Sequence, residues 1–153
     1  MDKKIILLIP NTSQKSNKGP NCKTYPYWNE LIDLLRPKYS LWQLLLNSEE
    51  KLLNVDKYVF VDRMIWEQID FLEQCHTWIS IDNYFQHLVH ASKIKKPGIV
   101  LWGKTDYRIY GYPENINLFV DEKYFRKDAY GKFHDEEWIP EAFVKPEEIL
   151  GKI

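Results

Sequence analysis

A strand-helix-strand unit over residues 78–105 constrains the fold more than any other part of the sequence. The apolar segment Trp78–Ile81 ends in Asp82-Asn83, and a short helical segment follows it. A second apolar strand, Gly98–Trp102, then ends in Gly103-Lys104-Thr105. Two strands joined by a helix usually run parallel, so that their carboxyl ends lie at one edge of a sheet. We therefore expect these polar residues to meet at the edge where open α/β sheets bind ligands.

The same alternation of strands and helices continues along the chain. Apolar, β-branched runs predict interior strands at Ile5–Ile9, Val59–Val61, Trp78–Ile81 and Ile99–Trp102. Further strands are expected at Tyr39–Leu46 and Asn117–Val120, and the Val59–Val61 run belongs to a strand over Lys57–Asp62. Within the first of these, Leu44-Leu45-Leu46 alone also suits a helix. Helices are expected after a Thr24 cap up to Leu35, over Met64–Gln74, after Asp82-Asn83, and over Pro146–Ile153.

This pattern predicts an α/β, three-layer, Rossmann-like domain with a mostly parallel sheet. The 153 residues are enough for one domain, 1–153, with an irregular aromatic and charged segment over 121–153. A formal net charge of -1 without a dense basic run argues against non-specific nucleic-acid binding. Cys22 and Cys75 match no metal spacing and are expected to be free thiols. With neither a signal peptide nor a membrane-length apolar run, we expect a cytoplasmic protein.

Several groups near the predicted edge have two interpretations. Asp82-Asn83 at a helix start suits a phosphate, but capping is the commoner role of Asp82. A lone helical histidine such as His87 is more often a packed residue than a catalyst. Gly103 permits either close approach of a ligand or a tight turn. Lys104, beside Thr105, suits phosphate or belongs to a solvated loop.

Three motifs, in order along the chain, carry a family resemblance. They are Lys23-Thr24-Tyr25-Pro26 with Trp28-Asn29-Glu30-Leu31, then Ile81-Asp82-Asn83-Tyr84-Phe85-Gln86-His87-Leu88, and Pro97–Thr105. They resemble the Lys-x-Trp-Pro element, the Asp-(Ser/Thr)-Gly-x-x-His-Leu element and the strand ending in Gly-x-Thr of the heptosyltransferase family, glycosyltransferase family nine. The chain thus resembles the C-terminal, nucleotide-sugar-binding half of a GT-B glycosyltransferase.

The resemblance implies roles for individual residues. Lys23 would contact the donor's phosphates or sugar, and as a loop lysine it is expected to contribute little to packing. Asn83 and Tyr84 would offer backbone N–H groups to the diphosphate. His87 would shape that pocket, and Thr105 would lie at its rim. The substrate-binding residues predicted together are Lys23, Asp82, Asn83, Tyr84, His87, Gly103, Lys104 and Thr105.

The sequence departs from the family in three respects. Tyr84 stands where the family has the glycine that admits the diphosphate, and Tyr25 replaces the usual tryptophan. The family's N-terminal domain, which binds the acceptor and is thought to supply the catalytic carboxylate, is expected to be absent. Transfer would then need a second protomer or a separate acceptor-binding chain. A homodimer would use exposed aromatic residues such as Tyr25, Tyr84 and Tyr107.

The resemblance implies a glycosyltransferase-like domain that binds a nucleotide-diphosphate sugar of the ADP-heptose class, with no metal and no cofactor. A non-catalytic protein that binds a nucleotide or nucleotide sugar is the alternative, as is an interaction domain that kept only the fold. The catalytic residues are not assigned.

Overall fold

The computed structural model describes residues 2–12, 19–46, 49–61, 66–131 and 136–153. Six strands lie in these residues, each where the apolar pattern predicts a strand. Their bounds are β1 (Lys4–Ile9), β2 (Tyr39–Leu45), β3 (Lys57–Phe60), β4 (Thr77–Ile81), β5 (Ile99–Leu101) and β6 (Ile116–Leu118). The expected end of the third strand, Asp62, lies outside the described residues.

The six strands form one sheet in the order β3-β2-β1-β4-β5-β6, and every neighbouring pair is parallel. Leu7 of β1 lies beside Trp42 of β2 on one side and Trp78 of β4 on the other. The strands progress outward from the centre in both directions, so the winding reverses between β1 and β4. Ligands of open α/β sheets bind at this reversal. The predicted α/β, Rossmann-like fold is confirmed.

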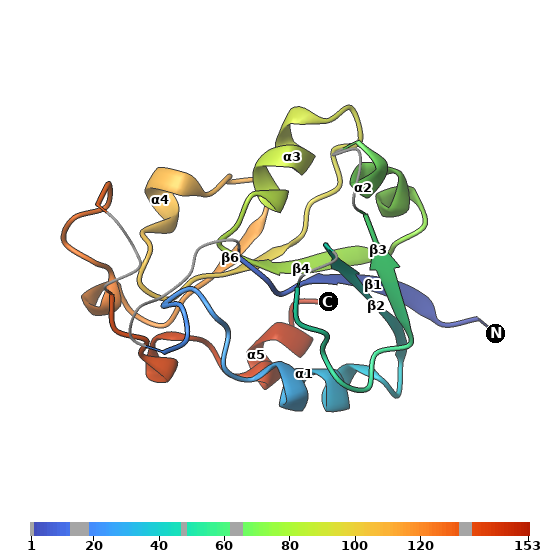
Figure 1. The fold of residues 1–153 in the computed structure, drawn as a ribbon, viewed down its shortest axis with the longest axis horizontal. Helices are drawn as coiled ribbons and strands as arrows, with labels where there is room; N and C mark the ends of the chain where they lie inside the picture. The colour runs from blue at the N-terminus through green and yellow to red at the C-terminus, as the bar shows by residue number, and fades with distance from the viewer. Residues whose placement is uncertain (1, 13–18, 47–48, 62–65, 132–135) are drawn as a thin grey trace.

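Helices cover both faces of the sheet and make three layers (Figure 1). Helices α1 (Trp28–Leu35) and α5 (Pro146–Leu150) lie on one face, and α2 (Glu67–Asp70) and α3 (Phe85–Ala91) lie on the other. Strand β1 serves both layers, because alternate side chains of a strand point to opposite faces. Ile6 and Leu8 pack in the core beneath α1, whereas Leu7 and Ile9 pack in the core beneath α3.

Two features of the sheet and its first helix differ from the sequence prediction. β3 is an edge strand, not an interior one, and the interior position belongs to β2. Of the β3 residues only Val59 is buried, while Phe60 is 50% exposed. Thr24 is not the helix cap, since α1 begins at Trp28 behind Tyr27. The carbonyl of Thr24 instead accepts a hydrogen bond from the Trp138 indole at 2.9 Å, which holds this segment outside the helix.

The other helices follow the prediction with shifted bounds. Of the helix expected over Met64–Gln74, residues 64 and 65 lie outside the described part, and the remainder is α2 followed by the 3-10 turn η1 (Phe71–Glu73). The final helix ends at Leu150. A short helix, α4 (Tyr107–Tyr110), has no counterpart in the prediction. Its Asp106 cap accepts a hydrogen bond from the Arg108 backbone N–H at 3.0 Å, a turn motif too short to give an apolar period.

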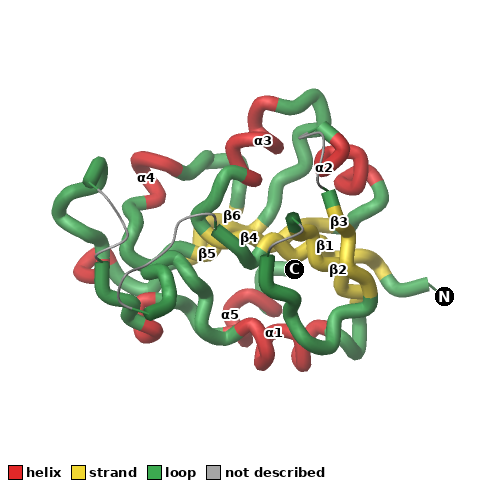
Figure 2. The backbone as a smooth tube through the Cα atoms, in the orientation of Figure 1, coloured by secondary structure: helices red, strands yellow, loops and turns green. Residues whose placement is uncertain are grey.

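The described residues between β6 and α5 form loops with two 3-10 turns, η2 (Glu122–Tyr124) and η3 (Pro140–Ala142) (Figure 2). It is anchored to the loop after β1, because the Tyr25 hydroxyl donates to the Val144 carbonyl at 3.0 Å and Phe143 is buried. Tyr25 is only 2% exposed, so the expectation that it lies on an exposed interface is wrong. Its ring packs edge-on against Trp28 and Phe143.

Candidate functional site

A buried ion pair spans the point where the winding of the sheet reverses. The Lys23 ammonium, from the loop after β1, lies 3.1 Å from Asp82 Oδ2, which follows β4. Their side chains are only 11% and 9% exposed. Apart from this ion pair, Asp82 Oδ2 accepts no hydrogen bond from the described residues. Both residues lie at the edge where the sequence predicts them, and the Lys23 side chain is nearly buried in an ion pair, which the sequence did not indicate.

Asn83, not Asp82, organises the start of α3. Its Oδ1 accepts from the Phe85 backbone N–H at 3.0 Å, which corrects the prediction that Asp82 caps this helix. Its Nδ2 donates to the carbonyls of Ile9 at 3.2 Å and Asn11 at 2.9 Å. Asn83 thus ties the end of β1 to the end of β4, and it occupies the Phe85 N–H that a phosphate would otherwise use.

A second set of charges lies at the same edge. Lys104, in the loop that follows β5, binds Glu136 Oε2 at 3.0 Å and donates to the Glu137 carbonyl at 2.9 Å. Arg126 lies 3.5 Å from Glu136 Oε1, and its backbone N–H donates to the Lys104 carbonyl at 2.8 Å. The side chains of Lys104 and Arg126 are 12% and 5% exposed.

Cys22 shows that the two sets of charges lie around one point. Burial raises the pKa of its thiol, while Lys23, Lys104 and Arg126 lower it and Glu136 raises it further. Such effects fall off with distance, so both sets of charges lie in the neighbourhood of the thiol. We call Lys23, Asp82, Lys104, Arg126 and Glu136 the charged cluster. Cys22 and Cys75 are free thiols, as the sequence predicts.

His87 lies beside the charged cluster on α3. Its Nδ1 is 2.7 Å from the Tyr112 hydroxyl. Burial lowers the pKa of His87, and among the smaller effects Asp82 raises it while Lys23 lowers it. These interactions place the imidazole near the Lys23–Asp82 pair, and its partial burial favours the neutral form.

The remaining predicted residues lie in other surroundings. The Tyr84 hydroxyl donates to Gln68 Oε1 of α2 at 2.6 Å, and burial raises its pKa to about 12. Thr105 is buried, with 3% exposure. A β-carbon added to Gly103 would lie 2.5 Å from Phe143 Cζ. The structure therefore pairs Lys23 with Asp82, and it places Lys104 and His87 at the same edge. Asn83 follows Asp82 at the start of α3, and Tyr84 is directed towards α2.

Gly103 provides a test of its packing role. We expect Gly103→Ala to lower the free energy of unfolding by about 1–3 kcal/mol, since the new methyl group overlaps the Phe143 ring. Gly151→Ala is the matched control, because its added β-carbon would have neighbours no closer than 3.6 Å. Urea denaturation of both variants measures the difference. Equal stability of the two variants would show that the Phe143 ring moves aside freely.

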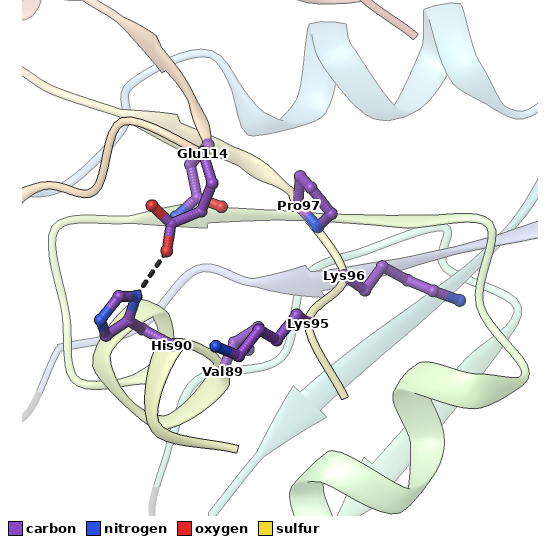
Figure 3. Close-up of a pocket in the computed structure, with 7 residues that line it drawn as sticks. Val89, His90, Lys95, Lys96, Pro97 and Glu114 are labelled. Carbon is purple, nitrogen blue, oxygen red and sulfur yellow. Dashed lines mark hydrogen bonds and ion pairs between the residues drawn. The ribbon is translucent and has the colours of Figure 1, made fainter. Parts of the chain in front are cut away.

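Two of the cavities lie at opposite edges of the sheet. One of about 300 Å³ lies at the carboxyl edge of β1 and β2, lined by residues that include Asn11, Thr24, Trp28 and Glu50. The buried Trp28 indole N–H has no hydrogen-bond acceptor among the described residues. The other, of about 240 Å³, lies at the amino edge between His90, Lys95 and Glu114 (Figure 3). The charged cluster shares its edge with the first cavity.

Within the described residues, no group of three or more His, Cys, Asp and Glu side chains is arranged to hold a metal ion. A search of the same residues finds no helix with the length and apolar character needed to cross a membrane.

Comparison with known protein families gives no match, and neither does comparison with curated proteins. Among solved structures, the chain is similar to the ADP-heptose LPS heptosyltransferase II of E. coli, with a TM-score of 0.68 over 99% of this chain. The two sequences are 11% identical, and the chain spans 45% of the length of that protein. The comparison supports a glycosyltransferase-type, Rossmann-like fold.

Sequence reasoning missed Arg126, Glu136 and Tyr112. Arg126 and Glu136 belong to the aromatic and charged segment after β6, where no periodic pattern indicates which charges turn inward. Tyr112 follows α4 in an equally irregular loop. The available signal was the density of charged residues among aromatic ones, since charges in such a setting are buried only when they are paired.

Proposed function

We propose that this protein binds a nucleotide-diphosphate sugar at the carboxyl edge of its sheet, as the donor-binding part of a glycosyl-transfer reaction. The observation that carries the proposal is the charged cluster beside the reversal point. Three cations lie there with little exposure to water, each near a carboxylate of the cluster. A desolvated ammonium or guanidinium interacts strongly with phosphate, because water screens it poorly.

The surroundings of the cluster suit the rest of such a ligand. The cavity of about 300 Å³ at the same edge combines polar and charged groups, Glu50 and Lys51 among them, with apolar walls such as Pro26 and Leu52. Hydroxyl groups of a sugar or ribose would find donors and acceptors there, and an apolar ring face would find the prolines and leucines. We propose ADP-heptose-like sugars first, in view of the similar fold of the heptosyltransferase.

In a transfer reaction the diphosphate is the leaving group and gains negative charge. Lys23, Lys104 and Arg126 would stabilise that charge without a metal ion, since they are already fixed before the ligand arrives. Asp82 and Glu136 hold the cations in place when the site is empty. A diphosphate would compete with Glu136 for Lys104 and Arg126.

The test is calorimetry with a panel of ADP-, UDP- and GDP-sugars. We expect binding of at least one nucleotide sugar, and Lys104→Met should weaken it by roughly ten- to a hundredfold, because a charge-assisted hydrogen bond is lost. Lys38→Met, an exposed lysine just after α1, is the matched control and should leave affinity unchanged. If no nucleotide sugar binds the parent protein, the donor-site proposal fails. Release of free sugar or transfer to an added acceptor then separates an enzyme from a non-catalytic binding protein.

A further inference from the structure

Tyr112 lies between two histidines of α3. Its hydroxyl is 2.7 Å from His87 Nδ1, and the two rings meet edge to face. Its ring stacks on His90, with centroids 3.9 Å apart and planes 15° apart. His87 and His90 are separated by three positions, so one helix face presents both to the same loop.

The position of Tyr112 is fixed from several directions. Its carbonyl accepts hydrogen bonds from the Asn115 N–H at 3.1 Å and from Asn117 Nδ2 at 2.9 Å. His90, which supports the face of the tyrosine ring, is held by Glu114 Oε1 at 2.5 Å (Figure 3). The phenol therefore meets His87 in one orientation.

The contact selects one form of the imidazole. A tyrosine hydroxyl keeps its proton at neutral pH and donates it, whereas a neutral imidazole has one acceptor nitrogen and one N–H. If the phenol donates to Nδ1, the His87 proton must reside on Nε2. In the reverse arrangement the phenol oxygen accepts from Nδ1–H and its proton turns to solvent, because no other described residue contacts the Tyr112 hydroxyl.

We propose that Tyr112 is a positioning residue that holds His87 neutral with its proton on Nε2, so that His87 donates a hydrogen bond to a phosphoryl oxygen of the ligand. The choice of ligand rests on the proposed function, and the choice of tautomer does not. Nε2 has no partner among the described residues, and the ring interacts with Lys23 and Asp82 of the charged cluster. An Nε2–H on this ring is a hydrogen-bond donor and so matches an oxyanion.

The first arm of the experiment uses ligand-free protein. NMR of protein with ¹⁵N-labelled histidine should show His87 as the Nε2–H tautomer at pH 7.5. Tyr112→Phe keeps the ring on His90 and removes the hydroxyl, so His87 should become a mixture of tautomers while the melting temperature changes little. A wild-type spectrum with the proton on Nδ1, or a Tyr112→Phe spectrum identical to the parent, would overturn the proposal. The wild-type spectrum alone decides the tautomer if the variant does not fold.

The second arm adds ADP as the probe. We expect the His87 Nε2 resonance to shift on binding, and Tyr112→Phe to weaken ADP binding by about two- to tenfold, the range of one hydrogen bond. If ADP binds and Nε2 does not respond, the ligand contact is refuted. If ADP and the nucleotide sugars do not bind at all, the proposed function fails, while the ligand-free spectra still decide whether Tyr112 sets the tautomer.

Discussion

We expect Lys23→Met to lower the free energy of unfolding by about 3 kcal/mol, a large effect for a residue in a loop. The variant leaves the Asp82 carboxylate, whose side chain is 9% exposed, without its ion-pair partner. Asp82 Oδ2 has no hydrogen bond from the described residues that would compensate. Burial of an uncompensated charge, and not the loss of the lysine's own contacts, is therefore the source of the cost. Urea denaturation followed by circular dichroism measures it.

The double variant Lys23→Met with Asp82→Asn separates these two causes. Removal of both charges leaves no unpaired ion, so the double variant should be clearly more stable than Lys23→Met alone. Arg108→Met is the surface control, because the Arg108 side chain is 53% exposed in its pair with Asp106, and it should change stability little. A Lys23→Met variant as stable as Arg108→Met would refute the buried-pair argument. Both Lys23→Met and the double variant should bind a nucleotide sugar more weakly than the parent does.

The strands could be predicted from the sequence because burial on both faces leaves a plain signal. Ile5–Ile9 is a continuous apolar run, Trp78–Ile81 is apolar except for Ser80, and both lie in central strands. The order of the strands has no such local signal. Val59 and Val61 are as apolar as interior residues, yet β3 lies at the edge of the sheet. Val59 is buried by the helix layer that covers one face of the sheet, and β3 has a neighbouring strand on one side only. Edge and centre are set by tertiary contacts.

The candidate site was predictable only where topology alone positions a residue. Lys23, Asp82 and Lys104 follow β1, β4 and β5, and parallel strands bring them to one edge regardless of detail. The direction of a side chain depends on its neighbours. Tyr84 turns to Gln68, and Gly103 accommodates the Phe143 ring, which arrives from a segment distant in sequence.

Asn83 is the residue whose loss should most disturb the centre of this edge. We expect Asn83→Ala to lower the free energy of unfolding by about 2–4 kcal/mol, because it leaves the Phe85 N–H and the Ile9 carbonyl without their partner in a site of 8% exposure. The loss should appear as a lower urea midpoint with an unchanged slope, since the surface exposed on unfolding stays the same.

The variant Asn83→Asp separates the contribution of the amide oxygen from that of the amide nitrogen. The carboxylate keeps an oxygen for the Phe85 N–H, but it cannot donate to the carbonyls of Ile9 and Asn11 and places a negative charge against them. Protonation of the new carboxyl group supplies an O–H donor in their place, and this form is favoured in the fold but not in the unfolded chain. The pKa of the new group is thus raised by folding, so the deficit relative to the parent should be largest at pH 7 and shrink as the pH falls towards 4. A deficit independent of pH would mean that the Nδ2 hydrogen bonds do not hold β1 to β4, and that Asn83 acts only through the start of α3.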